Sequence, residues 1–249
     1  MKIIWKIEQE DLINIRKFLE DNKDNIFVKK RISRNINKDY GEITKSDFFK
    51  TMISCLLTTQ QRSGPQSSVT KFINTKPFPL QYELCLKQAD LKNYILKTLD
   101  SYSGIRKKNK ITDEITTNLE VLEKKLWHKI FEMTVRLKSK DSIAEERMAA
   151  DLIMDNFKGF GPKQSRNLLQ SLGLTKYEIP IDSRITKWLE KYGFPIKLSA
   201  MALGDINYYN FISDGFQILC KEIGIEPCIM DAIIFSSYDL DWTEQNVVW

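Results

Sequence analysis

Apolar residues recur at three- and four-residue spacing over long parts of the chain, and alternating, strand-like runs are few. Glycine and proline, which interrupt helices, number only 10 and 7. The pattern therefore predicts an all-α protein. We expect helices over residues 8–22, 45–58, 91–99, 111–118, 122–138, 143–156, 162–172, 183–192, 208–223 and 227–238.

The predicted helix over 45–58 has the clearest apolar face. Ser46 is the expected N-cap, and the stripe that follows is formed by Phe48, Phe49, Met52, Ile53, Leu56 and Leu57. Such a stripe predicts one face in the core. The polar run 58–65 that ends this helix contains Gln60 and is less usual.

Composition narrows the class of protein without giving its function. With 249 residues the chain is long enough for one large domain or two small ones that share a cleft. Its 42% hydrophobic and 29% charged residues are typical of a soluble globular protein. The first residues lack a signal peptide and no stretch approaches a membrane span, so we expect an intracellular protein.

The spacing of the cysteines argues against zinc sites and disulfides, and the net charge permits a phosphate-rich partner. Cys55, Cys85, Cys220 and Cys228 form no CxxC pair, so neither a zinc site nor a disulfide framework is indicated. The net charge of +5 is compatible with a phosphate-rich partner but does not require one. A basic run at 106–110 is explained equally well by a solvated helix start and by phosphate contact.

The stretch 157–173 carries the most specific pattern in the sequence. It predicts a helix end, a tight turn at Gly159 and Gly161, and a second helix that Pro162 opens. Glycines let the backbone turn closely and leave amide N–H groups at the new helix start free to meet a phosphate oxygen. Alone, this pattern is also typical of a plain helix-helix turn.

Lys163 lies in the first turn of the second helix of this pattern. The positive end of a helix dipole disfavours a cation there, which favours the neutral, nucleophilic amine. Asp182 follows 19 positions later (182 − 163) and directly precedes another predicted helix. A carboxylate at that point is an N-cap and is also held in place for chemistry.

Together, 159-GFGPK-163 and the downstream 180-PID-182 resemble the helix-hairpin-helix DNA glycosylase superfamily. The segments 56–61 and 104–110 resemble that family's base-gap segment and its short basic turn. The likeness covers roughly residues 45 to 240. The cysteines do not supply the iron-sulfur motif of the endonuclease III branch, so the chain is most similar to the 8-oxoguanine branch.

The resemblance implies a fold and a domain division. It implies two helical lobes with a DNA-binding cleft between them, in a single glycosylase unit. We expect a central lobe over 46–150 and a second lobe formed by 1–45 and 151–249, which contains the hairpin.

The resemblance also implies roles for particular residues. Lys163 and Asp182 would be catalytic. Residues implied to contact DNA are Gln60, Gly159, Gly161 and Gln164. Asp231 and Phe235 would line the base pocket, with Phe235 stacking on the excised base, although core packing explains Phe235 on its apolar helix face at least as well.

The implied activity is that of a bifunctional DNA glycosylase/AP lyase that removes an oxidised base, 8-oxoguanine in the first place. Its partner would be double-stranded DNA with a damaged base. We expect a monomer that needs no metal or organic cofactor. Two alternatives stay open: a glycosylase for another damaged base, and a helix-hairpin-helix module that binds DNA without catalysis.

Overall fold

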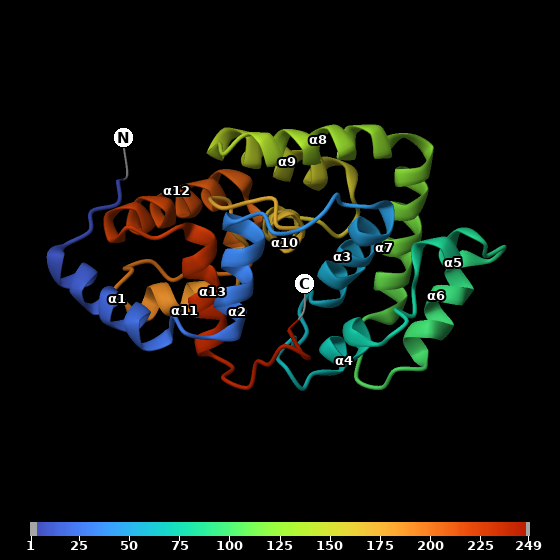
Figure 1. The fold of residues 1–249 in the computed structure, drawn as a ribbon, viewed down its shortest axis with the longest axis horizontal. Helices are drawn as coiled ribbons and strands as arrows, with labels where there is room; N and C mark the ends of the chain where they lie inside the picture. The colour runs from blue at the N-terminus through green and yellow to red at the C-terminus, as the bar shows by residue number, and fades with distance from the viewer. Residues whose placement is uncertain (1–3, 248–249) are drawn as a thin grey trace.

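The computed structural model describes residues 4–247, which form helices and no strand (Figure 1). The all-α prediction is confirmed. The helices are α1 (Gln9–Asn22), α2 (Ile26–Arg31), α3 (Lys45–Leu57), α4 (Ser68–Asn74), α5 (Tyr82–Leu86), α6 (Leu91–Asp100), α7 (Lys108–Val121), α8 (Trp127–Ser139), α9 (Ile143–Asn156), α10 (Pro162–Ser171), α11 (Ser183–Lys191), α12 (Ile206–Ile223) and α13 (Pro227–Ser237). Short π or 3-10 turns, η1 (Ile32–Ile36), η2 (Leu122–Leu126) and η3 (Ala202–Gly204), connect some of them.

Each helix predicted from the apolar pattern is present, with ends shifted by at most a few residues. The structure divides the predicted helix over 122–138 into the π-turn η2 and the helix α8. The cap of α3 differs from the prediction, because Thr44 and Asp47 form a capping box in place of Ser46. The Ser46 hydroxyl instead donates to Glu83 of α5.

Buried apolar side chains form two clusters. The first runs from Phe48 to Leu174 and includes α3, α7 and α10. The second combines α1 and α2 with the chain from Ile179 onward. The change between clusters therefore lies between Leu174 and Ile179.

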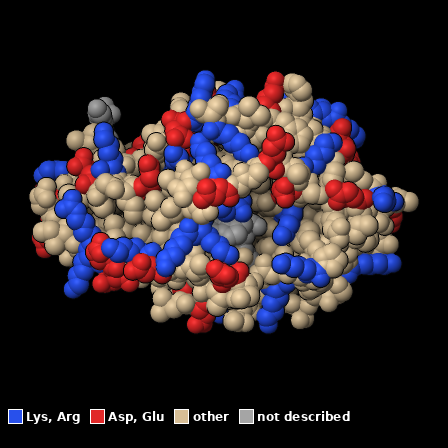
Figure 2. Space-filling view, in the orientation of Figure 1, with Lys and Arg blue, Asp and Glu red and all other residues tan. Residues whose placement is uncertain are grey.

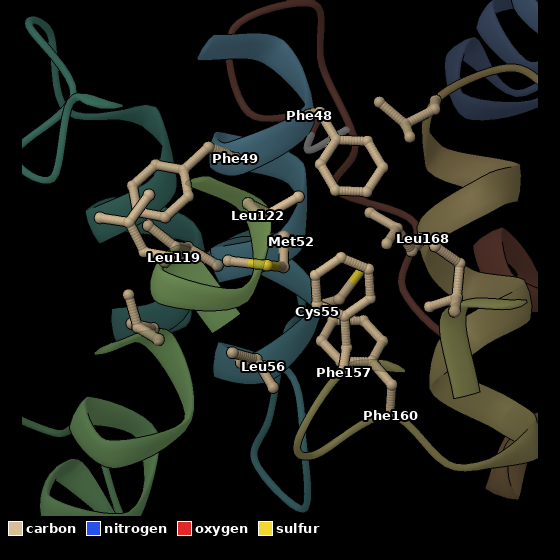
Figure 3. Packing of buried hydrophobic residues seen from close by; sticks show 14 of the residues in the cluster. Phe48, Phe49, Met52, Cys55, Leu56, Leu119, Leu122, Phe157, Phe160 and Leu168 are labelled. Atoms are coloured by element: carbon tan, nitrogen blue, oxygen red, sulfur yellow. The ribbon is translucent and has the colours of Figure 1, made fainter. Parts of the chain in front are cut away.

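The hairpin and α10 pack on α3 in the first cluster. Figure 3 shows Phe157 and Phe160 of the hairpin and Leu168 of α10 facing the side of α3 that carries Cys55. Phe157 and Phe160 are themselves in edge contact, with ring centroids 5.9 Å apart. This apolar support fixes where α10 begins, and hence where Lys163 stands.

Polar contacts tie α10 to the second cluster at its other end. The Gln170 side chain donates to Asp231 of α13 at 2.6 Å, and Arg31 and Asn35 donate to the Gln170 carbonyl. The helix α10 thus contacts both halves of the molecule.

Two further observations concern the whole described chain. All four cysteines are free and buried. Within residues 4–247, no helix is both long enough and apolar enough to cross a membrane.

Candidate active site

The hairpin between α9 and α10 is shaped by its first glycine. Gly159 has φ +87°, and a Cβ there would lie 2.7 Å from Leu56 and from Glu114. Asn118 of α7 fixes the preceding residue by accepting from the Lys158 amide and donating to its carbonyl. A Cβ on Gly161 would meet no protein atom within 4 Å, so this face of the turn is open to a partner.

Lys163 stands half-buried in the first turn of α10. Its Nζ donates to Oε1 of Gln164 at 3.3 Å, and it has no ion pair within the described chain. Burial raises the pKa of two of its neighbours, the Cys55 thiol on α3 and the Asp231 carboxyl on α13, and the charge of Lys163 opposes this rise in both. Lys163 therefore lies between the two halves of the molecule.

Gln164, a residue that the resemblance implied to contact DNA, makes its side-chain contacts inside the protein. Its side chain is buried, and its amide nitrogen donates to the Cys55 carbonyl at 2.8 Å and to Thr59 Oγ1 at 2.6 Å. These bonds cross from α10 to the end of α3. The side-chain amide nitrogen therefore makes both of its hydrogen bonds inside the protein, and it does not reach a phosphate from this position.

Asp182 follows an extended, buried segment of the chain. The Tyr209 hydroxyl donates to the Ile179 carbonyl and accepts from the Ile181 amide, which holds this segment against α12. Asp182 then caps α11: its Oδ1 accepts from the amides of Arg184 at 2.8 Å and Ile185 at 3.2 Å. The expected N-cap role is therefore present, and Oδ2 remains for other contacts.

Arg184 takes up that second oxygen. Its guanidinium donates to Asp182 Oδ2 at 3.3 Å and to Asp239 Oδ2 at 3.3 Å. It also lies 4.2 Å from the centre of the Phe235 ring. The carboxyl of Asp239 in turn lies against Gly64 of the other half, where an added Cβ would approach it to 3.2 Å.

Phe235 packs on the second cluster, as its apolar helix face allows. Its ring stacks on Phe27 with centroids 4.7 Å apart. Phe27 and the Arg184 guanidinium both pack against this ring.

Asp231 is buried beside the catalytic candidates. Burial raises the pKa of its carboxyl to about 6, against the opposing charge of Arg31, and the charge of Asp182 raises it further. Since the charges of both Asp182 and Lys163 act on Asp231, the structure brings these three residues of α10, α11 and α13 into one region.

Gln60 lies elsewhere, on an exposed turn that follows α3. It has φ +55°, and its side-chain oxygen Oε1 accepts a hydrogen bond from Nζ of Lys107, which also has a left-handed backbone. Gln61 reinforces this junction by accepting from the Arg106 amide at 2.7 Å. The two segments that sequence analysis had treated separately, 58–61 and 104–107, therefore form one surface.

Several residues around the site were not singled out from the sequence. Asn167 is four residues after Lys163, and this spacing on one helix face was a usable signal. Arg184, Gln170 and Tyr209 gave no such signal, because their partners come from other elements. No group of three or more His, Cys, Asp or Glu side chains among residues 4–247 is arranged to share a metal ion.

Comparison with known proteins gives one curated relative and several solved structures. No family model matches the chain. The curated 8-oxoguanine DNA glycosylase/AP lyase of Thermoplasma volcanium is 29% identical over 94 residues, which are 38% of this chain and 43% of that protein. The match therefore spans less than half of the relative's length.

Solved structures agree over nearly the whole chain. The 8-oxoguanine DNA glycosylase of Thermotoga maritima superposes with a TM-score of 0.66 at 15% identity, over 92% of this chain and 96% of that one. The Methanocaldococcus jannaschii 8-oxoguanine glycosylase/lyase in complex with DNA containing 8-oxoguanine gives 0.66 at 16% identity, over 90% and 96%. The resemblance found in the hairpin motif is thus confirmed, and the chain has the helix-hairpin-helix fold of the 8-oxoguanine DNA glycosylases.

Proposed function

We propose that this protein is a bifunctional DNA glycosylase/AP lyase that removes 8-oxoguanine from double-stranded DNA. The observation that carries the proposal is the placement of Lys163 and Asp182 at the starts of two helices, α10 and α11, within electrostatic reach of the same buried residue, Asp231. This pair stands in a fold shared with solved 8-oxoguanine DNA glycosylases.

The proposed chemistry uses these two residues in sequence. The neutral Nζ of Lys163 attacks C1′ of the flipped nucleotide as the bond from C1′ to the base breaks, and the base leaves with the electron pair and takes up a proton. Asp182 stabilises the positive charge that develops on the sugar and accepts a proton from the attacking amine. Ring opening gives a Schiff base, and loss of a C2′ proton then expels the 3′ phosphate.

The same proposal assigns the DNA contacts. The open face at Gly161, at the start of α10, would receive a backbone phosphate on its amide groups. Gln60, exposed next to Lys107, would fill the gap that the flipped base leaves. Figure 2 shows Lys and Arg side chains spread over the visible face with Asp and Glu side chains among them, and the net charge of +5 is compatible with an anionic partner.

The base pocket would form between Phe235 and Asp231. Arg184 packs against Phe235 and bonds Asp182, so a base that enters beside Phe235 would displace this guanidinium. Asp231, buried at the same place, would accept from the N–H groups of the base. We further propose that the protein acts as a monomer inside the cell.

Borohydride trapping on a duplex with a single 8-oxoguanine tests this function. The native chain is expected to form a covalent adduct that Lys163→Gln abolishes. Lys187→Gln, an exposed lysine of α11, is the matched control and should trap normally. An adduct on another lesion alone would replace 8-oxoguanine as substrate, whereas binding without any adduct would favour a non-catalytic DNA-binding module.

A further inference from the structure

The carboxamide of Gln164 uses all its hydrogen-bonding capacity at the junction of α10 and α3. Its nitrogen donates to the Cys55 carbonyl at 2.8 Å and to Thr59 Oγ1 at 2.6 Å. Its oxygen accepts from Asn167 Nδ2 at 3.1 Å and from Lys163 Nζ at 3.3 Å. Two donors and two acceptors therefore hold the group in one orientation.

That orientation is imposed by the backbone. A carbonyl oxygen can only accept, so the end of the amide that faces Cys55 must be the nitrogen. The oxygen is then directed toward Lys163. Because the side chain is buried, a flipped amide would leave two oxygens in contact, at the cost of an unsatisfied buried group.

The other groups around this amide leave the lysine amine free of a charged partner. Asn167 donates both to Gln164 and to the Cys55 sulfur at 3.3 Å. Burial raises the pKa of the Cys55 thiol to about 12, so at neutral pH it carries no charge. The nearest acceptor of Lys163 is therefore a neutral amide oxygen, which binds an N–H of the amine in either protonation state.

We infer that Gln164 is a positioning residue for Lys163, and that it couples the nucleophile to the turn at Thr59 that carries Gln60. This inference rests on the proposed function. By accepting one N–H, the Gln164 oxygen restrains the position of the Lys163 nitrogen at the start of α10. The nitrogen of the same amide binds Cys55, near the end of α3, and Thr59, the residue before Gln60.

Gln164→Met tests the inference, since methionine keeps the length and removes the amide. The substrate is a duplex with an abasic site, on which Schiff-base formation needs no base recognition. At saturating enzyme, the single-turnover rate of borohydride trapping is expected to fall about 100-fold, the effect of misplacing a reacting group by about 1 Å. The Kd for a duplex with a tetrahydrofuran abasic analogue should change less than about threefold.

Two further variants separate positioning from stability. Gln217→Met removes another half-buried amide, on α12, which donates to the Tyr177 carbonyl and to Glu178, and it should trap at the native rate. Thr59→Val removes one of the two acceptors of Gln164. It should slow trapping less, about fivefold, and it serves in place of Gln164→Met if that variant does not fold.

The outcomes distinguish this inference from the proposed function. A native chain that gives no adduct on the abasic duplex overturns both. A native chain that traps, together with Gln164→Met trapping within twofold of it, overturns the positioning role alone. The role is equally overturned if Kd weakens by as much as the rate falls, or if Gln164→Met is unfolded and Thr59→Val traps at the native rate.

Discussion

Asp182 has separate carboxylate oxygens for its structural role and for its proposed role in chemistry. One carboxylate oxygen accepts from two amides at the start of α11, and the other meets Arg184. Asparagine has an oxygen for the first task and lacks the negative charge for the second. The two roles are therefore separable by a single substitution.

Asp182→Asn is expected to fold and to lose activity. Asparagine caps a helix about as well as aspartate does, so the free energy of unfolding should change by less than about 1 kcal/mol. The single-turnover rate of base release should fall by about 10² or more, because the charge that assists the amine is gone. Asp205→Asn at the cap of α12 is the matched control. Equal rates for Asp182→Asn and the native chain would remove Asp182 from the mechanism.

Asp231 predicts a pH dependence of stability. Its pKa is raised from 3.8 to about 6 in the folded protein, so folding favours the neutral carboxyl. Its contribution to the free energy of unfolding is complete below about pH 4 and is lost as the pH rises through about 6, by about 3 kcal/mol for about two pKa units.

Urea denaturation of the native chain and of Asp231→Asn across this range measures the effect. The stability of the native chain relative to the variant should decline as the pH rises from about 4 to about 7. A difference that does not vary with pH would show that the carboxyl titrates at its ordinary value.

At the scale of elements, the hairpin glycines differ in what they do. Gly159→Ala forces a Cβ into Leu56 and Glu114 at a positive φ, and should lower the free energy of unfolding by about 2 kcal/mol, with a fall in Tm of several degrees. Gly161→Ala places its methyl in open space and should cost at most about 1 kcal/mol, the weaker cap included.

For DNA binding, we expect the larger effect from Gly161→Ala. The methyl of Gly161→Ala stands where a phosphate would approach, so the Kd for undamaged duplex should weaken by about fivefold, corresponding to about 1 kcal/mol. Calorimetry and fluorescence anisotropy on both variants measure the two effects. Unchanged affinity in Gly161→Ala would place the DNA elsewhere.

The sequence predicted the helices that are long enough for their apolar residues to show a helical period. The helices α3, α9 and α12, with 13, 14 and 18 residues, were predicted within two residues at each end. The helices α2, α4 and α5 have 6, 7 and 5 residues, too few for a period, and were missed. Their existence depends on packing against longer helices.

The same limit applies to the site. Lys163 and Asp182 could be found because their motifs are local. The placement of Gln164 could not, because its partner Cys55 is 109 positions away and no local pattern links them. The resemblance implied a DNA contact for this residue, and its side chain is buried against α3.

At the scale of the whole molecule, the net charge is only +5, so DNA binding should depend on where individual cations lie. Lys107 is exposed beside Gln60, at the junction of two turns. If it contacts a phosphate, Lys107→Gln should reduce the slope of log Kd against log salt by about 0.9, the release of one counterion. Lys129→Gln on the exposed face of α8 should leave the slope unchanged. Equal slopes for all three proteins would exclude Lys107 from the DNA contact.

The burial of the cysteines determines how readily their thiols react with oxidants. Burial raises the pKa of Cys55, Cys85 and Cys228 to about 12, so these thiols stay protonated as well as shielded. Peroxides react with thiolates, and a buried neutral thiol is a poor target for them. These thiols should therefore resist oxidation by peroxides at neutral pH.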